Sequence, residues 1–420
     1  MPTNKLTVSS GDLTLDISGR VGADFISGNN STSNASALAI TTDDGNNGIT
    51  VRPGDTFTAQ MDGFITPVIG RVGGIGVSEK NFNGLDFNGR TKIGTVDVDV
   101  AFEVSALSPA LPLAFMQKAY VNISSDYGSL KLGTDRGLYG RTARECDNTV
   151  GYVLDRISVG HLGAGRTDVP IKAQMLYTLP SMSGFTASVG ITSTQLIDGD
   201  PTDTAIASSG GCTNHIINPN QLGVEAELSY DISSYFPGVE GKVWASGLSQ
   251  DVRSVLATTN GTLERATNFS AKATGFDYGT KLSIMGLELA AAGFQGNGLG
   301  VFAQFSGGVD GLNTTGVLSN IGLRKSDGVF VQASYPLPVV GTVLQGSFGT
   351  SNLKANGNRV ADSAITSTRL DKNEMFTLGL RQDFSDDLNF KFEFANSTAK
   401  NVRGEKTTQK NVSFGGKWKF

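Results

Sequence analysis

The chain has 420 residues and a formal net charge of −5, and only 17% of its residues are charged. The basic residues are scattered, which argues against nucleic acid as a partner, and no run of about 18 apolar residues predicts a transmembrane helix. Glycine is frequent, with 54 residues and no collagen period, which indicates tight turns and loops. A membrane-spanning β-barrel is still compatible with this composition, because barrels cross the bilayer with alternating strands.

Several segments alternate with a period of two residues. In the last of them, Val412 and Phe414 share one parity, whereas Lys417 and Lys419 share the other. One face of each segment carries charge and the other carries almost none, so we predict that one face meets water and the other an apolar medium. In chain order these segments are 13–25, 95–104, 222–232, 388–394 and 411–420. We expect the last to pair with the first and to close a barrel.

The predicted connections alternate between short turns and long polar loops, which is the layout of an outer-membrane barrel. The count gives 16 antiparallel strands, or 18 if the strand-like stretches 56–77 and 299–306 join the barrel, and this size leaves a water-filled bore. We treat 1–420 as one barrel domain. Short connections lie near 94–95, 126–128, 180–184, 233–238, 336–341 and 385–387, and long ones cover roughly 26–83, 135–168, 194–220, 295–326 and 351–372.

Several of these segments resemble strands of the general porins of Gram-negative bacteria. The stretch FNGRTKIGTVDVDVAFEV from Phe87 is similar to the second and third strands of that family. The stretch QKAYVNISSDYGSLKLGTDRGLY from Gln117 resembles the strand–turn–strand before the constriction loop. YTLPSMSGFTASVG from Tyr177 and ASYPLPVVGTVLQGSFG from Ala333 look like later hairpins, and LTLDISGRVGADF and NVSFGGKWKF look like the first and last strands. The resemblance implies a homotrimer of 16-stranded barrels, each with its own pore.

The same resemblance implies that the third external loop, about 135–168, folds into the lumen and narrows it. In the family, loop carboxylates face basic residues on the wall, and the field between them sorts solutes. Thr134 and Leu176 stand where the family often has arginine, so we carry over no ion selectivity. The candidate constriction residues are Arg20, Arg90, Lys131, Asp135, Arg136, Arg141, Arg144, Glu145, Asp147, Asp155, Lys172 and Arg381.

The remaining candidate sites lie in predicted loops. Cys146 and Cys212 could form one disulfide in an oxidising compartment, or stay two free thiols. The apolar stretch 107–116 could contact a neighbouring subunit or the rim of its own barrel. No metal motif or nucleophile elbow occurs, so we predict no metal site, no cofactor and no enzymatic activity; His161 alone is a candidate for catalysis. The N-terminus lacks a basic region followed by an apolar run, so we expect that any signal peptide has been removed.

The sequence therefore predicts an outer-membrane porin through which small hydrophilic solutes and ions diffuse passively. The expected partners are outer-membrane lipid, two further copies of the chain and the barrel assembly machinery, for which Trp418 and Phe420 form a candidate recognition signal. Two alternatives remain at this point. One is a substrate-specific channel that prefers anions, and the other is a structural or adhesive barrel plugged by its loops.

Overall fold

The structure is a computed structural model, and it describes most of the strand framework and part of the loops. The described residues are 5–32, 60–61, 64–65, 75–78, 83–108, 111–148, 161, 163–167, 171–194, 197–198, 215–216, 222–233, 235–236, 238–252, 255–259, 262–266, 270–300, 308–312, 318–338, 341–354, 370–401 and 406–419. Within this part of the chain, no helix is long and apolar enough to cross a membrane.

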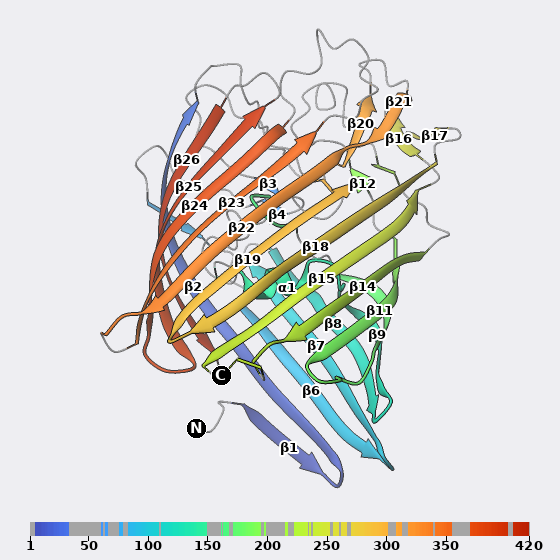
Figure 1. Cartoon of the computed structure of the whole chain (residues 1–420), viewed down its shortest axis with the longest axis vertical. Helices are drawn as coiled ribbons and strands as arrows, with labels where there is room; N and C mark the ends of the chain where they lie inside the picture. The colour runs from blue at the N-terminus through green and yellow to red at the C-terminus, as the bar shows by residue number, and fades with distance from the viewer. Residues whose placement is uncertain are drawn as a thin grey trace.

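Sixteen described strands pair antiparallel with their neighbours in a circuit that returns to its first strand, as the sequence predicts (Figure 1). The circuit closes where β26 pairs with β2, with Lys419 opposite Arg20 and Thr407 opposite Thr32. The strands, in order around the barrel, are β2 (Leu13–Thr32), β6 (Asn83–Ile93), β7 (Val96–Ser108), β8 (Leu111–Ser125), β9 (Gly128–Arg136), β10 (Ile171–Thr178), β11 (Phe185–Ser193), β14 (Leu222–Asp231), β15 (Val239–Val252), β18 (Ala271–Ile284), β19 (Leu287–Asn297), β22 (Lys325–Pro336), β23 (Thr342–Lys354), β24 (Leu370–Asp383), β25 (Leu388–Asn401) and β26 (Lys406–Lys419).

Two further strands bring the main sheet to 18, and both pair only with β2. β1 (Leu6–Ser10) pairs with Leu13–Ile17, so the beginning of β2 pairs with β1 and only its later part pairs with β26. β5 (Ile75–Ser78) pairs with Asp24–Ser27. Three small sheets contain the other strands: β3 (Gln60–Met61) with β4 (Phe64–Ile65), β12 (Ile197–Asp198) and β13 (His215–Ile216) with β16 (Val255–Thr259) and β17 (Thr262–Ala266), and β20 (Val309–Leu312) with β21 (Leu318–Leu323).

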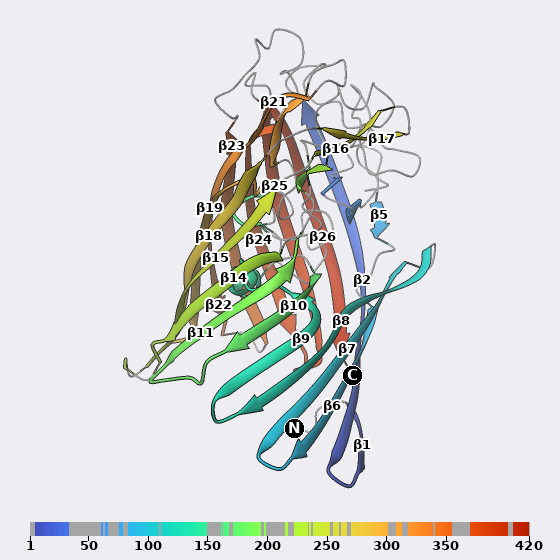
Figure 2. The same ribbon diagram turned by 90° about the vertical axis from the view of Figure 1, so that its right-hand side faces the viewer.

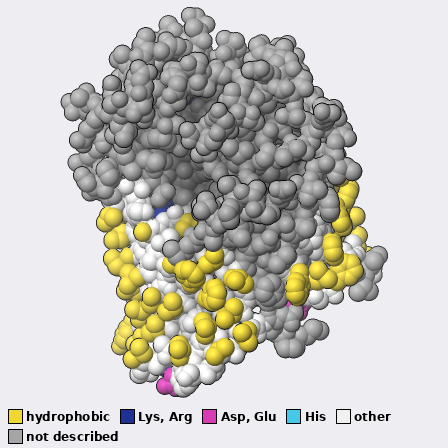
Figure 3. Space-filling model, turned by 180° about the vertical axis from the view of Figure 1, so that it is seen from behind, with side chains coloured by type: hydrophobic (Ala, Val, Ile, Leu, Met, Phe, Trp, Pro, Cys, Tyr) yellow, Lys and Arg dark blue, Asp and Glu magenta, His cyan; other side chains and the backbone are white. Residues whose placement is uncertain are grey.

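The barrel wall carries apolar side chains outside and polar ones inside. In β14, Leu228 is 50% exposed, whereas its neighbour Glu227 on the other face is 7% exposed. Hydrophobic side chains form a broad area over the described outer surface (Figure 3). An exposed apolar area of this extent needs an apolar environment, because soluble monomers rarely expose such patches.

The turns at one end of the barrel are short, and some of them extend further from the barrel than others. Gly94, in the turn between β6 and β7, has a φ of +63°, which favours glycine. The β1–β2, β6–β7 and β8–β9 turns extend below the remaining short turns in both views (Figures 1 and 2). At the opposite end β7 reaches Ser108 and β8 begins at Leu111, so the stretch 107–116 is mostly the end of a long hairpin rather than the loop that the sequence predicts.

A candidate pore with an inward-folded loop

The connection between β9 and β10 folds into the barrel, where it carries the helix α1 (Arg141–Cys146) (Figure 1). The residue before the helix, Gly140, has a φ of +73°, a backbone conformation that glycine adopts without strain. Leu138 and Tyr139, just before it, are fully buried. The described loop residues, 137–148, 161 and 163–167, contact the wall from β14 to β25 through a series of hydrogen bonds.

Two carboxylates of β14 hold the beginning of the loop. Glu225 Oε2 accepts hydrogen bonds from the backbone N–H of Leu138 (2.6 Å) and of Tyr139 (3.2 Å). Glu227 accepts from the Thr142 hydroxyl (2.8 Å) and from Arg141 Nη2 (3.1 Å). Hydrogen bonds to ionised acceptors are stronger than neutral ones. The wall therefore supplies the negative charge, and the loop supplies the donors.

An apolar cluster lies between α1 and the lumen side of the wall. Ala143 and Cys146 of the loop pack with Trp244 of β15, with Ala290 and Ala292 of β19, and with Phe330 of β22. These wall residues interrupt the polar inner face where the helix lies. Burial raises the pKa of the Cys146 thiol to about 11. Cys146 is a free thiol enclosed by this apolar cluster. Its candidate partner in a disulfide, Cys212, lies outside the described residues.

The end of the helix is held by β22 and β25. The backbone N–H of Asn148 donates to Gln332 Oε1 (2.9 Å), and Gln332 Nε2 donates to the carbonyl oxygen of Cys146. Lys391 Nζ, on β25, donates to the carbonyl oxygen of Asn148 (3.3 Å). The helix is thus fixed at both ends, by β14 at its start and by β22 and β25 at its finish.

A second turn of the loop lies against β23. Asp147 Oδ2 accepts from the backbone N–H of His161 and from Arg166 Nε, both at 2.9 Å. The carbonyl oxygen of Ala164 can only accept, so His161 Nδ1 donates to it (3.1 Å), and Nε2 accepts from the Ser347 hydroxyl (2.6 Å). Burial lowers the pKa of His161, which therefore stays neutral. The contacts make His161 a structural residue of the loop.

Gly349 explains how the loop approaches β23 so closely. A Cβ atom at this position would overlap the Ala164 carbonyl oxygen and lie against His161 Nδ1. The neighbouring inward position on β23, Ser351, accepts a hydrogen bond of 2.8 Å from the backbone N–H of Gly165. The absence of a side chain at Gly349 therefore allows backbone contact between loop and wall.

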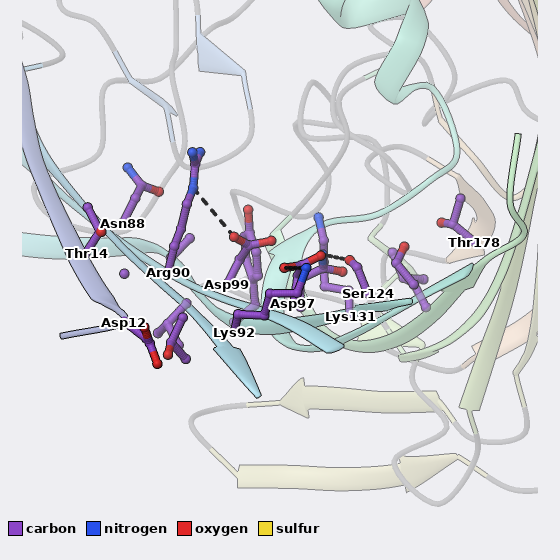
Figure 4. Close-up of a pocket in the computed structure, with 18 of the residues that line it drawn as sticks. Asp12, Thr14, Asn88, Arg90, Lys92, Asp97, Asp99, Ser124, Lys131 and Thr178 are labelled. Atoms are coloured by element: carbon purple, nitrogen blue, oxygen red, sulfur yellow. Dashed lines mark hydrogen bonds and ion pairs between the residues drawn. The ribbon is translucent and has the colours of Figure 1, made fainter. Parts of the chain in front are cut away.

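On the other side of the loop, an open cavity of about 840 Å³ lies against β2 and β6–β10 (Figure 4). Arg141 reaches it from the loop, and Arg90 and Lys131 reach it from the wall. Lys131 pairs with Asp135 at 2.8 Å and lies 4.3 Å from the centre of the Tyr120 ring. The wall opposite the loop thus carries paired charges of both signs instead of a uniformly basic surface.

The structure distributes the predicted constriction residues among several places. Asp135 and Lys172 are buried, Lys172 in an ion pair with Glu225. Arg381 pairs with Asp383 at 2.9 Å, at the short-turn end of β24 and apart from the loop. In the loop, Glu145 is exposed and Arg144 is half-buried, and Arg136 is the last residue of β9. Arg20 is described only by its place in β2, and Trp418 is exposed at the end of β26. Asp155 and Phe420 lie outside the described residues.

Sequence reasoning missed the residues that hold the loop. Glu225 and Glu227 were visible as charges on the inner face of a strand, but nothing in the sequence connects them to the N–H groups of residues 138–139. Nothing in the sequence distinguishes Gln332 and Ser347 as contacts of the loop, because uncharged polar residues are expected everywhere on a water-facing wall. Such long-range partners depend on how the loop folds inside the barrel.

Comparisons with known proteins agree with this fold. No protein-family model matches the sequence, and no curated protein matches it. Among solved structures, the outer-membrane channel DcaP of Acinetobacter baumannii is similar over 98% of this chain and 99% of its own, with a TM-score of 0.67 and 13% identity. An anion-selective porin from Comamonas acidovorans is similar over 97% of this chain and 100% of its own, with a TM-score of 0.54 and 13% identity. OmpF of Salmonella typhi, in complex with daunomycin, is similar over 99% and 100%, with a TM-score of 0.54 and 12% identity. At these identities the similarity establishes the fold, that of an antiparallel outer-membrane β-barrel.

Proposed function

We propose that this protein is an outer-membrane porin that lets small hydrophilic solutes and ions diffuse passively through a water-filled channel. The observation that carries the proposal is the barrel with an apolar outer face and a polar inner face, with a loop folded against one side of the lumen and an open cavity against the other. A barrel of this strand number leaves room for an aqueous path. The transport requires no chemistry, so no catalytic group or cofactor enters the proposal.

The apolar outer face supports a location in the outer membrane, with lipid as its main contact. Insertion there would use the barrel assembly machinery, with Trp418 in the strand to be recognised. A homotrimer is the proposed assembly, and the long β7–β8 hairpin, which projects beyond the wall in Figure 2, is the proposed contact with a neighbouring subunit. Cross-linking of the purified protein in mild detergent tests the trimer, and a monomer under all such conditions would refute it.

Planar-bilayer recording tests the channel itself. A diffusion porin gives large ohmic current steps in KCl that competing solutes reduce only weakly. Small currents that one solute blocks at low concentration would favour the substrate-specific channel instead. A folded, purified protein that gives no current at all would refute the proposal and favour a plugged, structural barrel.

A further inference from the structure

On the part of the cavity wall that β6 and β7 form, near the short-turn end, the charges are sorted by strand. β6 contributes two cations, Arg90 and Lys92, and the neighbouring strand β7 contributes two carboxylates, Asp99 and Asp97. The strand register places Arg90 opposite Asp99 and Lys92 opposite Asp97. A cationic column therefore runs along β6 beside an anionic column along β7, and both face the cavity (Figure 4).

These charges are only loosely paired with each other. Arg90 Nε lies 3.5 Å from Asp99 Oδ1, and their side chains are 68% and 41% exposed. Lys92 Nζ lies 3.7 Å from Asp97 Oδ1, with side chains that are 62% and 59% exposed. By contrast, both side chains of the Lys172–Glu225 pair are only 2% exposed. Exposed pairs contribute little to stability, so a solute can replace one partner at small cost.

The next strand adds neutral hydrogen-bonding groups. Asn122 and Ser124 of β8 lie opposite Asp99 and Asp97, and both line the cavity. Asn122 Nδ2 donates to Ser124 Oγ at 2.9 Å. The anionic column is thus bordered by cations on one side and by neutral polar groups on the other, which leaves the carboxylates accessible to a positively charged group.

We propose that this wall is a binding subsite for zwitterionic solutes of the size of an amino acid or a short peptide; the proposal rests on the proposed porin function. Neighbouring strands are about 4.8 Å apart, so a carboxylate over β6 and an ammonium group over β7 can belong to one small molecule. The Arg90 guanidinium presents paired donors that suit a carboxylate. A solute with only negative charge would be repelled by Asp97 and Asp99, and a purely cationic solute would be repelled by β6.

Four solutes of similar size separate charge pattern from size: glycylglycine (zwitterion), N-acetylglycinate (anion), glycylglycinamide (cation) and N-acetylglycinamide (neutral). Each is added to the side of a planar bilayer that faces the short turns, and the concentration that blocks half of the KCl current is measured. In the native protein, glycylglycine should block at a concentration about three- to tenfold lower than the other three, as expected for two exposed ionic contacts.

Two variants remove one column each. Arg90→Gln/Lys92→Gln should abolish the preference for the zwitterion and favour glycylglycinamide, whereas Asp97→Asn/Asp99→Asn should favour N-acetylglycinate. The matched control is Asp251→Asn/Lys272→Gln, which removes another loose cross-strand pair that does not line the cavity; its two charged atoms are 3.6 Å apart, and the side chains of Asp251 and Lys272 are 40% and 62% exposed. The control should block like the native protein.

Equal block by the zwitterion and the neutral solute in the native protein would overturn the subsite and leave the porin proposal intact, because the KCl current is measured in the same membrane. An unchanged order of the four solutes in both column variants would also overturn it. A native protein without KCl current would overturn the porin function, and the subsite with it.

Discussion

Gly349→Ala should release the second turn of the inward-folded loop from β23. The added Cβ would overlap the Ala164 carbonyl oxygen, so this turn would have to move away from the wall. Overpacking of this kind costs about 1–3 kcal/mol. The movement would also break the hydrogen bonds from Ser347 to His161 and from Gly165 to Ser351, each contributing about 0.5–1.5 kcal/mol.

The sum is about 2–6 kcal/mol in favour of the undocked loop, and its lower limit corresponds to roughly a 30-fold shift in the docking equilibrium. Hydrogen–deuterium exchange of the peptide that contains residues 161–167 measures this shift. We expect exchange to accelerate by at least that factor, while peptides from β14 exchange as in the native protein. Single-channel currents should become noisier, because part of the loop would move within the pore.

Gly346→Ala provides a matched control on the same strand. A Cβ at Gly346 would find no atom closer than 3.9 Å, so the loop should keep its native exchange rate. Native exchange rates in Gly349→Ala would refute the docked position of the loop on β23. Equal acceleration in both variants would show that the effect comes from the strand rather than from contact with the loop.

Three further predictions concern the same loop. Glu225→Gln leaves the buried Lys172 without its carboxylate and should lower the free energy of unfolding in denaturant by about 3 kcal/mol. The control Glu145→Gln, at an exposed position, should change it by less than about 0.5 kcal/mol, and equal effects would contradict the role of Glu225 in holding the loop. With a pKa of about 11, Cys146 should be alkylated by iodoacetamide at pH 8 more than about 100-fold slower than an exposed thiol of ordinary pKa, as measured by peptide mass mapping, and fast labelling would contradict its burial. The lowered pKa of His161 means that the unfolded state takes up its proton first, so the stabilisation is complete above about pH 6.5 and is lost as the pH falls from there towards the folded-state pKa. The protection of residues 161–167 against hydrogen exchange, relative to the intrinsic rate at each pH, should therefore fall on acidification, and His161→Gln should remove this pH dependence.

The strand framework could be predicted because a bilayer allows few solutions. Side chains alternate between the two faces of a strand, as with Leu228 outside and Glu227 inside, because one face contacts lipid and the other contacts water. This alternation can be recognised in the sequence of most strands. The pattern is less informative at Trp244 and Phe330, which are apolar and yet face the lumen because α1 covers them. Cys146 is a free, buried thiol in this apolar cluster, which the sequence alone could not show.

The candidate site was less predictable than the fold. The segment that enters the lumen could be located by resemblance, but its partners on the wall depend on contacts between residues far apart in the chain, such as His161 with Ser347. The placement of the charges also depends on the folded loop. The family resemblance implied loop carboxylates opposite basic wall residues, whereas here Asp147 accepts hydrogen bonds from His161 and Arg166 of the loop, and Glu227 of the wall accepts one from the loop arginine Arg141.

Bilayer recording of the purified native protein in KCl, alongside Gly349→Ala, tests the central claim most directly, namely that a water-filled channel is narrowed by a loop docked on the wall. We predict large ohmic steps for the native protein, and altered step size and noise for the variant. A native protein that conducts no current would contradict the channel, and identical steps and noise in the two proteins would contradict the role of the docked loop.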